Sequence, residues 1–216
     1  MLALTHLPSP SLDRGLRTHI ARVPVDYDAA VRQHVAYCQM LRDCGAQVVT
    51  LDVNRNWPDS TFIEDTAVVL DEIAVVASMG TPARRGEVVG VEIELEKYRE
   101  LHRLEPPATL EGGDALLVGR TLLVGVSQRT NRAGVQALEA VVRRYGYRLV
   151  PVLVAGCLHL KSACTALPDG SLLVNRSWLD PSALRPFEVV PIPEEEPWAA
   201  NTLSIGETVC LAVNHM

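Results

Sequence analysis

The chain has 216 residues and a formal net charge of -6, with 48% hydrophobic and 21% charged residues. This composition is typical of a soluble globular protein with one large domain or two small ones. No Lys/Arg-rich run occurs, and this argues against nucleic acid as a partner, because phosphate binding needs a concentrated basic face. No stretch resembles a membrane span or a signal peptide, so we expect no membrane partner and a cytoplasmic location.

The cysteine pattern predicts reduced thiols. The five cysteines form no C-x-x-C pair and no spacing typical of a metal site, and their number is odd. Most are best interpreted as small apolar core residues. They are Cys38, Cys44, Cys157, Cys164 and Cys210.

The N-terminal part of the chain predicts a helix between extended segments. Residues 2–23 form a weak candidate hairpin, which contains Pro8 and Pro10. Residues 27–44 are predicted as a helix that ends at Gly45. A strand over residues 47–53 follows the helix.

An internal repeat sets the architecture of the remainder. Residues 65–78, 114–127 and 201–214 align without a gap, and each contains two apolar runs around a short central turn. Each segment therefore predicts a tight β-hairpin. A fourth copy over residues 161–175 is one residue longer and has a Pro-Asp-Gly turn.

Helices and short strands are predicted after the hairpins. Residues 85–101 and 131–145 have apolar positions at helical spacing, and Gly146 ends the second of these helices. The closing strands are short and lie near prolines. They are predicted over residues 104–106, 148–152 and 187–191.

The repeated unit is therefore hairpin, helix and strand, and it predicts an α+β fold. Five such ββαβ units, beginning near residues 1, 58, 108, 157 and 199, would form a single propeller-like domain. The fifth unit has only its hairpin before the sequence ends at Met216. An incomplete unit leaves an open sheet edge, so the chain is expected to be truncated and to associate or be unstable as it stands.

Unusual polar residues precede the predicted hairpins. Acidic residues occur within residues 59–65 and 111–114, and His159 lies at the corresponding place in the next unit. In a closed ring these segments converge near the axis. Carboxylates gathered there repel one another unless a cation joins them, and a planar guanidinium fits that role.

Five motifs occur in order over nearly the whole chain. They are D-S-x-F-x-E-D at residues 59–65, E-G-G-D at 111–114, S-x-R-T-N at 127–131, L-H-L-K at 158–161 and I-P-E-E-E at 192–196. Together they resemble the dimethylarginine dimethylaminohydrolase branch of the pentein, or amidinotransferase, superfamily. The resemblance implies a five-unit α/β-propeller and hydrolysis of N-methylated arginine to citrulline and an alkylamine, a reaction of arginine metabolism.

The resemblance also implies roles for individual residues. His159 would be the general acid/base, and Glu111 would orient it and contact the substrate guanidinium. Asp65 would hold the guanidinium with support from Glu64, and Asp59 would meet the amino-acid end of the substrate. Three further substrate-binding residues are implied: Arg84 and Arg129 on the α-carboxylate, and Leu16 in a mobile lid.

The resemblance implies a cysteine nucleophile that this sequence does not supply at the expected place. The nucleophile should lie beyond Met216, and Cys157, two residues from His159, is an unfavoured substitute. The thiolate would attack the guanidinium carbon and expel the amine, and water would release the ureido product. No metal or organic cofactor is required.

Structural interpretations of the same residues stay open at this stage. His159 taken alone is more often a structural residue, and Glu64 suits a backbone-capping role. Asp114 is interpreted as structural. The chemistry of Arg84 and of Arg129, taken alone, fits a structural role and a substrate-binding role equally.

The sequence leaves three functions open. The first is a methylarginine hydrolase whose partner is a small-molecule substrate, with a homodimer possible. The second is a catalytically inactive pentein that binds an arginine-like ligand or assembles with another chain, and the third is a hydrolase or deiminase acting on free arginine.

Overall fold

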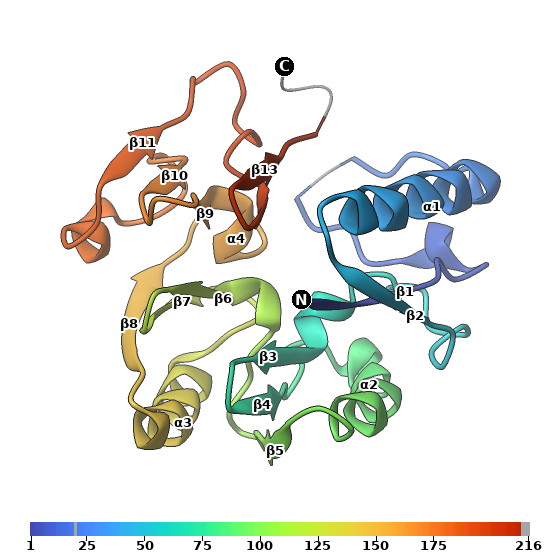
Figure 1. Ribbon diagram of the computed structural model, residues 1–216, viewed down its shortest axis with the longest axis horizontal. Coiled ribbons are helices and arrows are strands. Elements are labelled where there is room, and N and C mark those ends of the chain that lie inside the picture. Colours follow the sequence, from blue (N-terminus) through green and yellow to red (C-terminus); the bar gives the residue numbers. More distant parts are fainter. Residues whose placement is uncertain (20, 213–216) are drawn as a thin grey trace.

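The computed structural model describes residues 1–19 and 21–212. Five small sheets surround a common centre, and the three longer helices lie on the outside (Figure 1). These helices are α1 (Tyr27–Asp43), α2 (Glu87–Leu95) and α3 (Arg132–Val142). The arrangement confirms the predicted mixed fold of repeated units. Within the described residues, no helix is long and apolar enough to cross a membrane.

The second and third sheets have the full hairpin–helix–strand pattern. Strands β3 (Ala67–Val69) and β4 (Ile73–Val76) form an antiparallel hairpin, and β5 (Glu100–Arg103) pairs parallel to β4 after α2. Strands β6 (Ala115–Val118), β7 (Thr121–Val126) and β8 (Arg148–Leu153) repeat this order around α3. The parallel pairing follows from the crossover helix, which returns the chain in its original direction.

The fourth sheet has the same strand order with a shorter connection. Hairpin β9 (Cys164–Ala166) and β10 (Leu172–Val174) is followed by β11 (Val189–Pro191), parallel to β10. Only a 3₁₀ helix, Pro181–Leu184, lies in the connection. Pro186 lies two residues after its end and cannot donate a backbone hydrogen bond, which disfavours a longer helix.

The fifth sheet is the hairpin β12 (Leu203–Ile205) and β13 (Thr208–Cys210). Its turn contains Gly206 at φ +56°, a left-handed conformation that favours glycine. The hairpin is held to the fourth sheet by side-chain hydrogen bonds: the Thr165 hydroxyl donates to the Ala200 carbonyl at 2.7 Å, and the Ser204 hydroxyl donates to the Ala166 carbonyl at 2.7 Å.

The first sheet corrects the predicted hairpin in residues 2–23. Only one strand forms there, β1 (Leu2–His6), and it pairs parallel to β2 (Gln47–Leu51) across α1. Among the described residues between 7 and 23 no second strand occurs; a 3₁₀ helix lies at Leu12–Arg14 instead. Pro8 and Pro10 explain the difference, because neither can donate to a β-ladder.

The boundary between α2 and its strand also differs from the prediction. The helix ends at Leu95 instead of residue 101, and the strand occupies Glu100–Arg103 instead of residues 104–106. The strand position is fixed by its register with β4, in which Ile73 pairs with Glu100. Tertiary pairing therefore overrides the helical pattern of the last turn.

The apolar core lies between neighbouring units. One cluster joins β3 and β4 to the β6–β7 hairpin and to α3 through Ile73, Leu122 and Leu138, which are all buried. A second joins the β7–β8 sheet to the fourth unit through Leu123, Val152 and Leu172. Because each unit buries its apolar face against the next, the segments that lead into the hairpins are brought together at the centre.

Candidate active site

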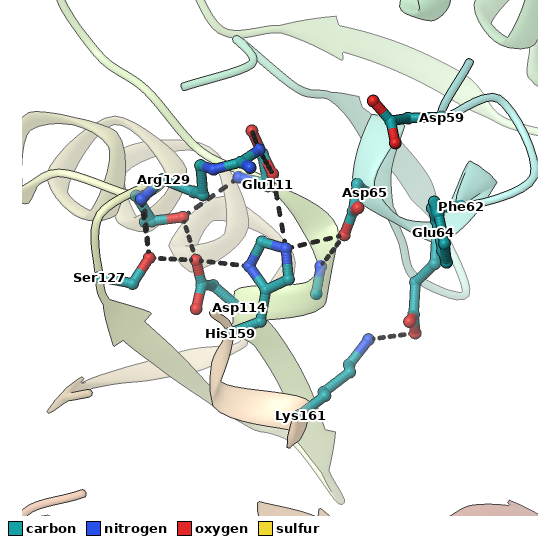
Figure 2. A network of polar contacts seen from close by, with 12 residues as sticks. Asp59, Phe62, Glu64, Asp65, Glu111, Asp114, Ser127, Arg129, His159 and Lys161 are labelled. Carbon is teal, nitrogen blue, oxygen red and sulfur yellow. Dashed lines mark hydrogen bonds and ion pairs between the residues drawn. The ribbon is translucent and has the colours of Figure 1, made fainter. Parts of the chain in front are cut away.

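Three segments that lead into the hairpins meet at the centre of the ring. They are the 3₁₀ helices Ile63–Thr66 and Gly112–Asp114 and the short helix α4 (Leu160–Ala163). They bring Asp65, Glu111 and His159 together, and all three side chains are buried (Figure 2). The carboxylate oxygens of Asp65 and Glu111 each lie 3.5 Å from Nε2 of His159. The convergence expected from the repeat is therefore present.

The two ring nitrogens of His159 have different surroundings. Nδ1 is hydrogen-bonded to the Asp114 carboxylate at 3.3 Å. Nε2 is buried, and within the described part of the chain it has no hydrogen-bond partner. A buried polar atom without a partner calls for an explanation, and Nε2 is the ring nitrogen that stays available to a ligand.

Asp114 has a more definite role than its sequence context indicated. Besides the ring, it accepts hydrogen bonds from the hydroxyls of Ser127 and Thr130, each at 2.7 Å, and from the backbone amide of Leu160 at 2.9 Å. These bonds fix the Asp114 carboxylate, which in turn fixes the plane and tautomer of the ring. The structure therefore gives Asp114, and not Glu111, the hydrogen bond that orients His159. The repeat offered a signal, because Asp114 occupies the position of Asp65 in the next copy.

Arg84 lies inside the acidic cluster. Its guanidinium contacts Asp65 at 2.6 Å and Glu87 at 2.9 Å, and it donates to the backbone carbonyls of Asp59 and Phe62 at 3.3 and 3.2 Å. Sequence reasoning missed Glu87, which is 1% exposed. Its spacing of three residues from Arg84 on a helical segment was the available signal.

Arg129 is held by the other side of the cluster. Its Nη1 donates to both oxygens of Glu111, at 3.2 and 3.1 Å. Among the described residues the Arg129 side chain makes no other hydrogen bond or ion pair, so the rest of its guanidinium has donors to spare. Arg84 and Arg129 thus lie together at the site, although both face protein carboxylates.

Burial and mutual repulsion shift the protonation of the central groups. Burial raises the pKa of Glu111, and repulsion from Asp65 adds to the effect; Arg129, His159 and Arg84 oppose it. Burial alone would lower the pKa of His159, but the hydrogen bond to Asp114 and the charges of Asp65, Asp114 and Glu111 outweigh it and raise the pKa. The cluster therefore favours an imidazolium at His159.

These shifts predict that stability falls as pH rises above neutrality. A raised pKa in the folded state favours the protonated form. The stability that His159 contributes is therefore fully present below its ordinary pKa of 6.5, and it is lost as the pH rises through the higher pKa of the folded state. Glu111 acts in the same direction. Urea unfolding between pH 6 and 9 should show a declining free energy of unfolding, and the slope should flatten in His159→Gln. An equal slope in both proteins would contradict the assignment.

Gly113 allows the close packing of this site. Its amide donates to Asp65 Oδ1 at 3.2 Å. A Cβ at this position would lie 2.7 Å from Asp65 Oδ1 and 2.9 Å from the ring of His159. The E-G-G-D motif therefore requires glycine at this position because the backbone lies against the side chains of Asp65 and His159. The sequence had indicated only a tight turn.

Asp59 and Leu16 are neighbours at one side of the cluster. The Asp59 carboxylate is buried and accepts the backbone amide of Leu16 at 3.1 and 3.3 Å. Leu16 is 42% exposed. The structure therefore ties the predicted lid segment to Asp59 through its backbone.

Glu64 points away from the cluster. Its side chain is 63% exposed and pairs with Lys161 at 2.6 Å (Figure 2). Exposed ion pairs contribute little, so Glu64→Gln should change the free energy of unfolding by less than about 1 kcal/mol. Chemical denaturation of Glu64→Gln and Lys161→Met would measure this. A loss several times larger would mean that the pair holds the two segments together.

Asp65, Glu111 and His159 could also offer one ligand atom each to a metal ion, since these atoms lie within 4.8 Å of one another. Arg84 and Arg129 already bring positive charge to the two carboxylates. A metal would have to compete with both guanidiniums, so a cationic organic group with hydrogen-bond donors suits the cluster better.

The five cysteines supply no evident thiolate to the site. Cys157 is buried and its thiol donates to the backbone carbonyl of His159 at 3.3 Å. Burial and the nearby charge of Asp114 raise the pKa of Cys157 to about 11. Burial raises that of Cys164 to about 12. Thiols with such values are poor nucleophiles near neutral pH.

Comparison with known proteins shows the family of the chain. The sequence model of eukaryotic N,N dimethylarginine dimethylhydrolases matches residues 22–160. An N(G),N(G)-dimethylarginine dimethylaminohydrolase of Streptomyces coelicolor is 41% identical over 194 residues, which cover 89% of this chain and 75% of the relative. The corresponding protein of Pseudomonas aeruginosa is 30% identical over 214 residues, covering 98% of this chain and 84% of that protein.

Solved structures extend the agreement to the fold. A mutant of the Pseudomonas aeruginosa protein complexed with citrulline superposes with a TM-score of 0.93, covering 99% of this chain and 84% of that one at 30% identity. The N-terminal domain of the arginine dihydrolase ArgZ shares the fold at 20% identity and a TM-score of 0.82. The matches in sequence and in fold agree, and the chain belongs to the dimethylarginine dimethylaminohydrolase family of the pentein superfamily.

Proposed function

We propose that this protein hydrolyses the guanidino group of N-methylated arginine to give citrulline and an alkylamine. The observation that carries the proposal is the unpartnered Nε2 of His159, buried between the carboxylates of Asp65 and Glu111. The names of the relatives support the substrate class, and one of the solved relatives is complexed with citrulline.

The charge of the cluster supports a guanidinium substrate. Three buried carboxylates lie at the His159 ring and a fourth lies beside Arg84. With all four ionised, one negative charge remains after the two guanidiniums and a protonated ring are counted. One further cation with several donors would neutralise it. The four carboxylates are Asp65, Glu87, Glu111 and Asp114.

The two arginines are not equivalent as partners for the substrate α-carboxylate. The donors of Arg84 are taken up by carboxylates and backbone carbonyls, whereas Arg129 uses only Nη1 on Glu111. We therefore place the α-carboxylate at Arg129 first, with Arg84 chiefly supporting the cluster. Asp59 and Leu16 would meet the amino-acid end of the substrate.

The reaction needs a thiolate that attacks the guanidinium carbon. His159 Nε2 would donate its proton to the departing amine, and the resulting adduct would lose its thiol when water, deprotonated by the same nitrogen, attacks the carbon. Asp65 and Glu111 would hold the guanidinium nitrogens, and Asp114 would keep the ring in place. Because the buried thiols of Cys157 and Cys164 are poor nucleophiles, we assign the attacking thiol to a cysteine outside these 216 residues.

Two other functions are kept as alternatives. An inactive pentein that binds an arginine-like ligand would use the same cluster without turnover. A hydrolase of free arginine would need no room for methyl groups. A single domain of five units, a homodimer and a cytoplasmic location also belong to this proposal.

The first test is the intact mass of the protein from its source organism, followed by a citrulline-release assay. Dimethylarginine, arginine and agmatine should be compared at equal concentrations. A mass above 23.6 kDa with turnover of dimethylarginine would support the proposal. A mass of 23.6 kDa with tight citrulline binding and no turnover would favour the inactive binder, and preference for arginine would favour the third function.

A further inference from the structure

The last hairpin and the first unit meet outside the acidic cluster. Ile205 of β12 and Cys210 of β13 pack against Met40, Leu41 and Cys44 at the C-terminal end of α1. The two elements also lie side by side in Figure 1, where β13 faces the end of α1 that leads into β2. No strand pairing joins these two sheets within the described residues, so side chains alone make this contact.

Two half-buried thiols lie in this contact. Cys210 donates to Met40 Sδ at 3.1 Å, and Cys44 lies one helical turn after Met40, on the same face of the helix. Cys44 and Cys210 belong to the same packed cluster, and Cys44 is, after burial, the second cause of the raised pKa of Cys210. The other three cysteines are fully buried.

We propose that Cys44 and Cys210 form a reversible disulfide that ties the β12–β13 hairpin to the first unit. The two residues are 166 positions apart in the sequence, and they belong to elements with no shared hydrogen-bonded ladder. Cys210 must turn from Met40 toward Cys44 for the sulfurs to reach a bond of about 2.05 Å. A covalent link here would join the fifth unit to the first.

The oxidant would be a small organic disulfide of the glutathione type. The thiolate of one cysteine attacks a sulfur of the small disulfide, forms a mixed disulfide and releases one small thiol. The thiolate of the second cysteine then attacks the protein sulfur and releases the other small thiol. Two electrons pass to the small disulfide, the two protons of the protein thiols end on the two small thiols, and excess small thiol reverses the reaction.

The test uses native wild-type protein incubated with oxidised glutathione. Digestion without reduction should yield one linked peptide pair that contains Cys44 and Cys210, with a mass two hydrogens below the sum of the two free peptides. The oxidised protein should melt about 5 °C above the reduced one, because the link closes a long loop. The double variant C44S/C210S, which keeps the three buried cysteines, should show neither effect.

The single variants distinguish an internal disulfide from independent reaction of each thiol with glutathione. C44S and C210S should each carry glutathione on the remaining cysteine of the pair and form no internal link. Glutathione on both thiols of the wild type without a link, a linked dimer, or a link through a buried cysteine would each overturn the proposal. A link without a rise in melting temperature would overturn its role in holding the hairpin. None of these measurements uses catalytic activity, so they are independent of the proposed hydrolysis.

Discussion

Replacing His159 with glutamine should lower kcat for citrulline release by about 10²- to 10⁴-fold, since this is the contribution of a positioned general acid/base. Glutamine keeps a polar side chain next to Asp114 but cannot exchange a proton at the position of Nε2. The measurement is steady-state turnover of dimethylarginine by the catalytically complete protein. KM should change far less than kcat, because the ring acts on the departing amine and on water.

A matched histidine provides the control for this prediction. His102 in β5 contacts the Tyr145 hydroxyl at 2.9 Å and lies away from the acidic cluster. His102→Gln should retain kcat. If His159→Gln also retains it, with the folded structure intact, the role assigned to Nε2 is wrong. Asp114→Asn tests the orienting bond, and it should lower kcat while leaving Nε2 in place.

Replacing Arg84 with methionine should destabilise the fold by about 3–5 kcal/mol, because it leaves buried carboxylates without their cation. Arg84 is 4% exposed and contacts both Asp65 and Glu87. Methionine has a similar length and keeps the packing of the side-chain stem. Urea denaturation at neutral pH measures the loss.

Arg85 is the natural control, since it is exposed and adjacent in sequence. Arg85→Met should change the free energy of unfolding by less than about 1 kcal/mol. The double variant Arg84→Met/Glu87→Gln should recover part of the loss, because one uncompensated charge is removed. Equal losses in Arg84→Met and Arg85→Met would show that the buried cluster does not depend on the guanidinium.

The repeat in the sequence was sufficient for the outline of the fold. Apolar runs on either side of a central turn specify hairpins locally, and the four predicted hairpins from residue 65 onward all form, the last of them within the residues described up to 212. Helices α1 and α3 end close to their predicted residues, where Gly45 and Gly146 adopt positive φ. These signals are local, because they depend on backbone preferences and on which face of an element is apolar.

Features that depend on pairing between distant segments could not be obtained from these patterns. The candidate hairpin in residues 2–23 has apolar residues on both sides of a break, yet β1 pairs with β2 across α1. The position of β5 is set by its register with β4 instead of by the helical pattern before it. Both outcomes depend on which ladder partner is available in the folded chain.

The sequence by itself determined the residue types at the centre of the ring: a histidine, several carboxylates and two arginines placed just before hairpins or after them. Only the tertiary structure decided how they pair. It put Asp114 on Nδ1 of His159, surrounded Arg84 with acceptors and turned Glu64 outward to Lys161. The physical reason is that a side chain's partners and desolvation are fixed by neighbours from other units, and no local pattern records which neighbours those are.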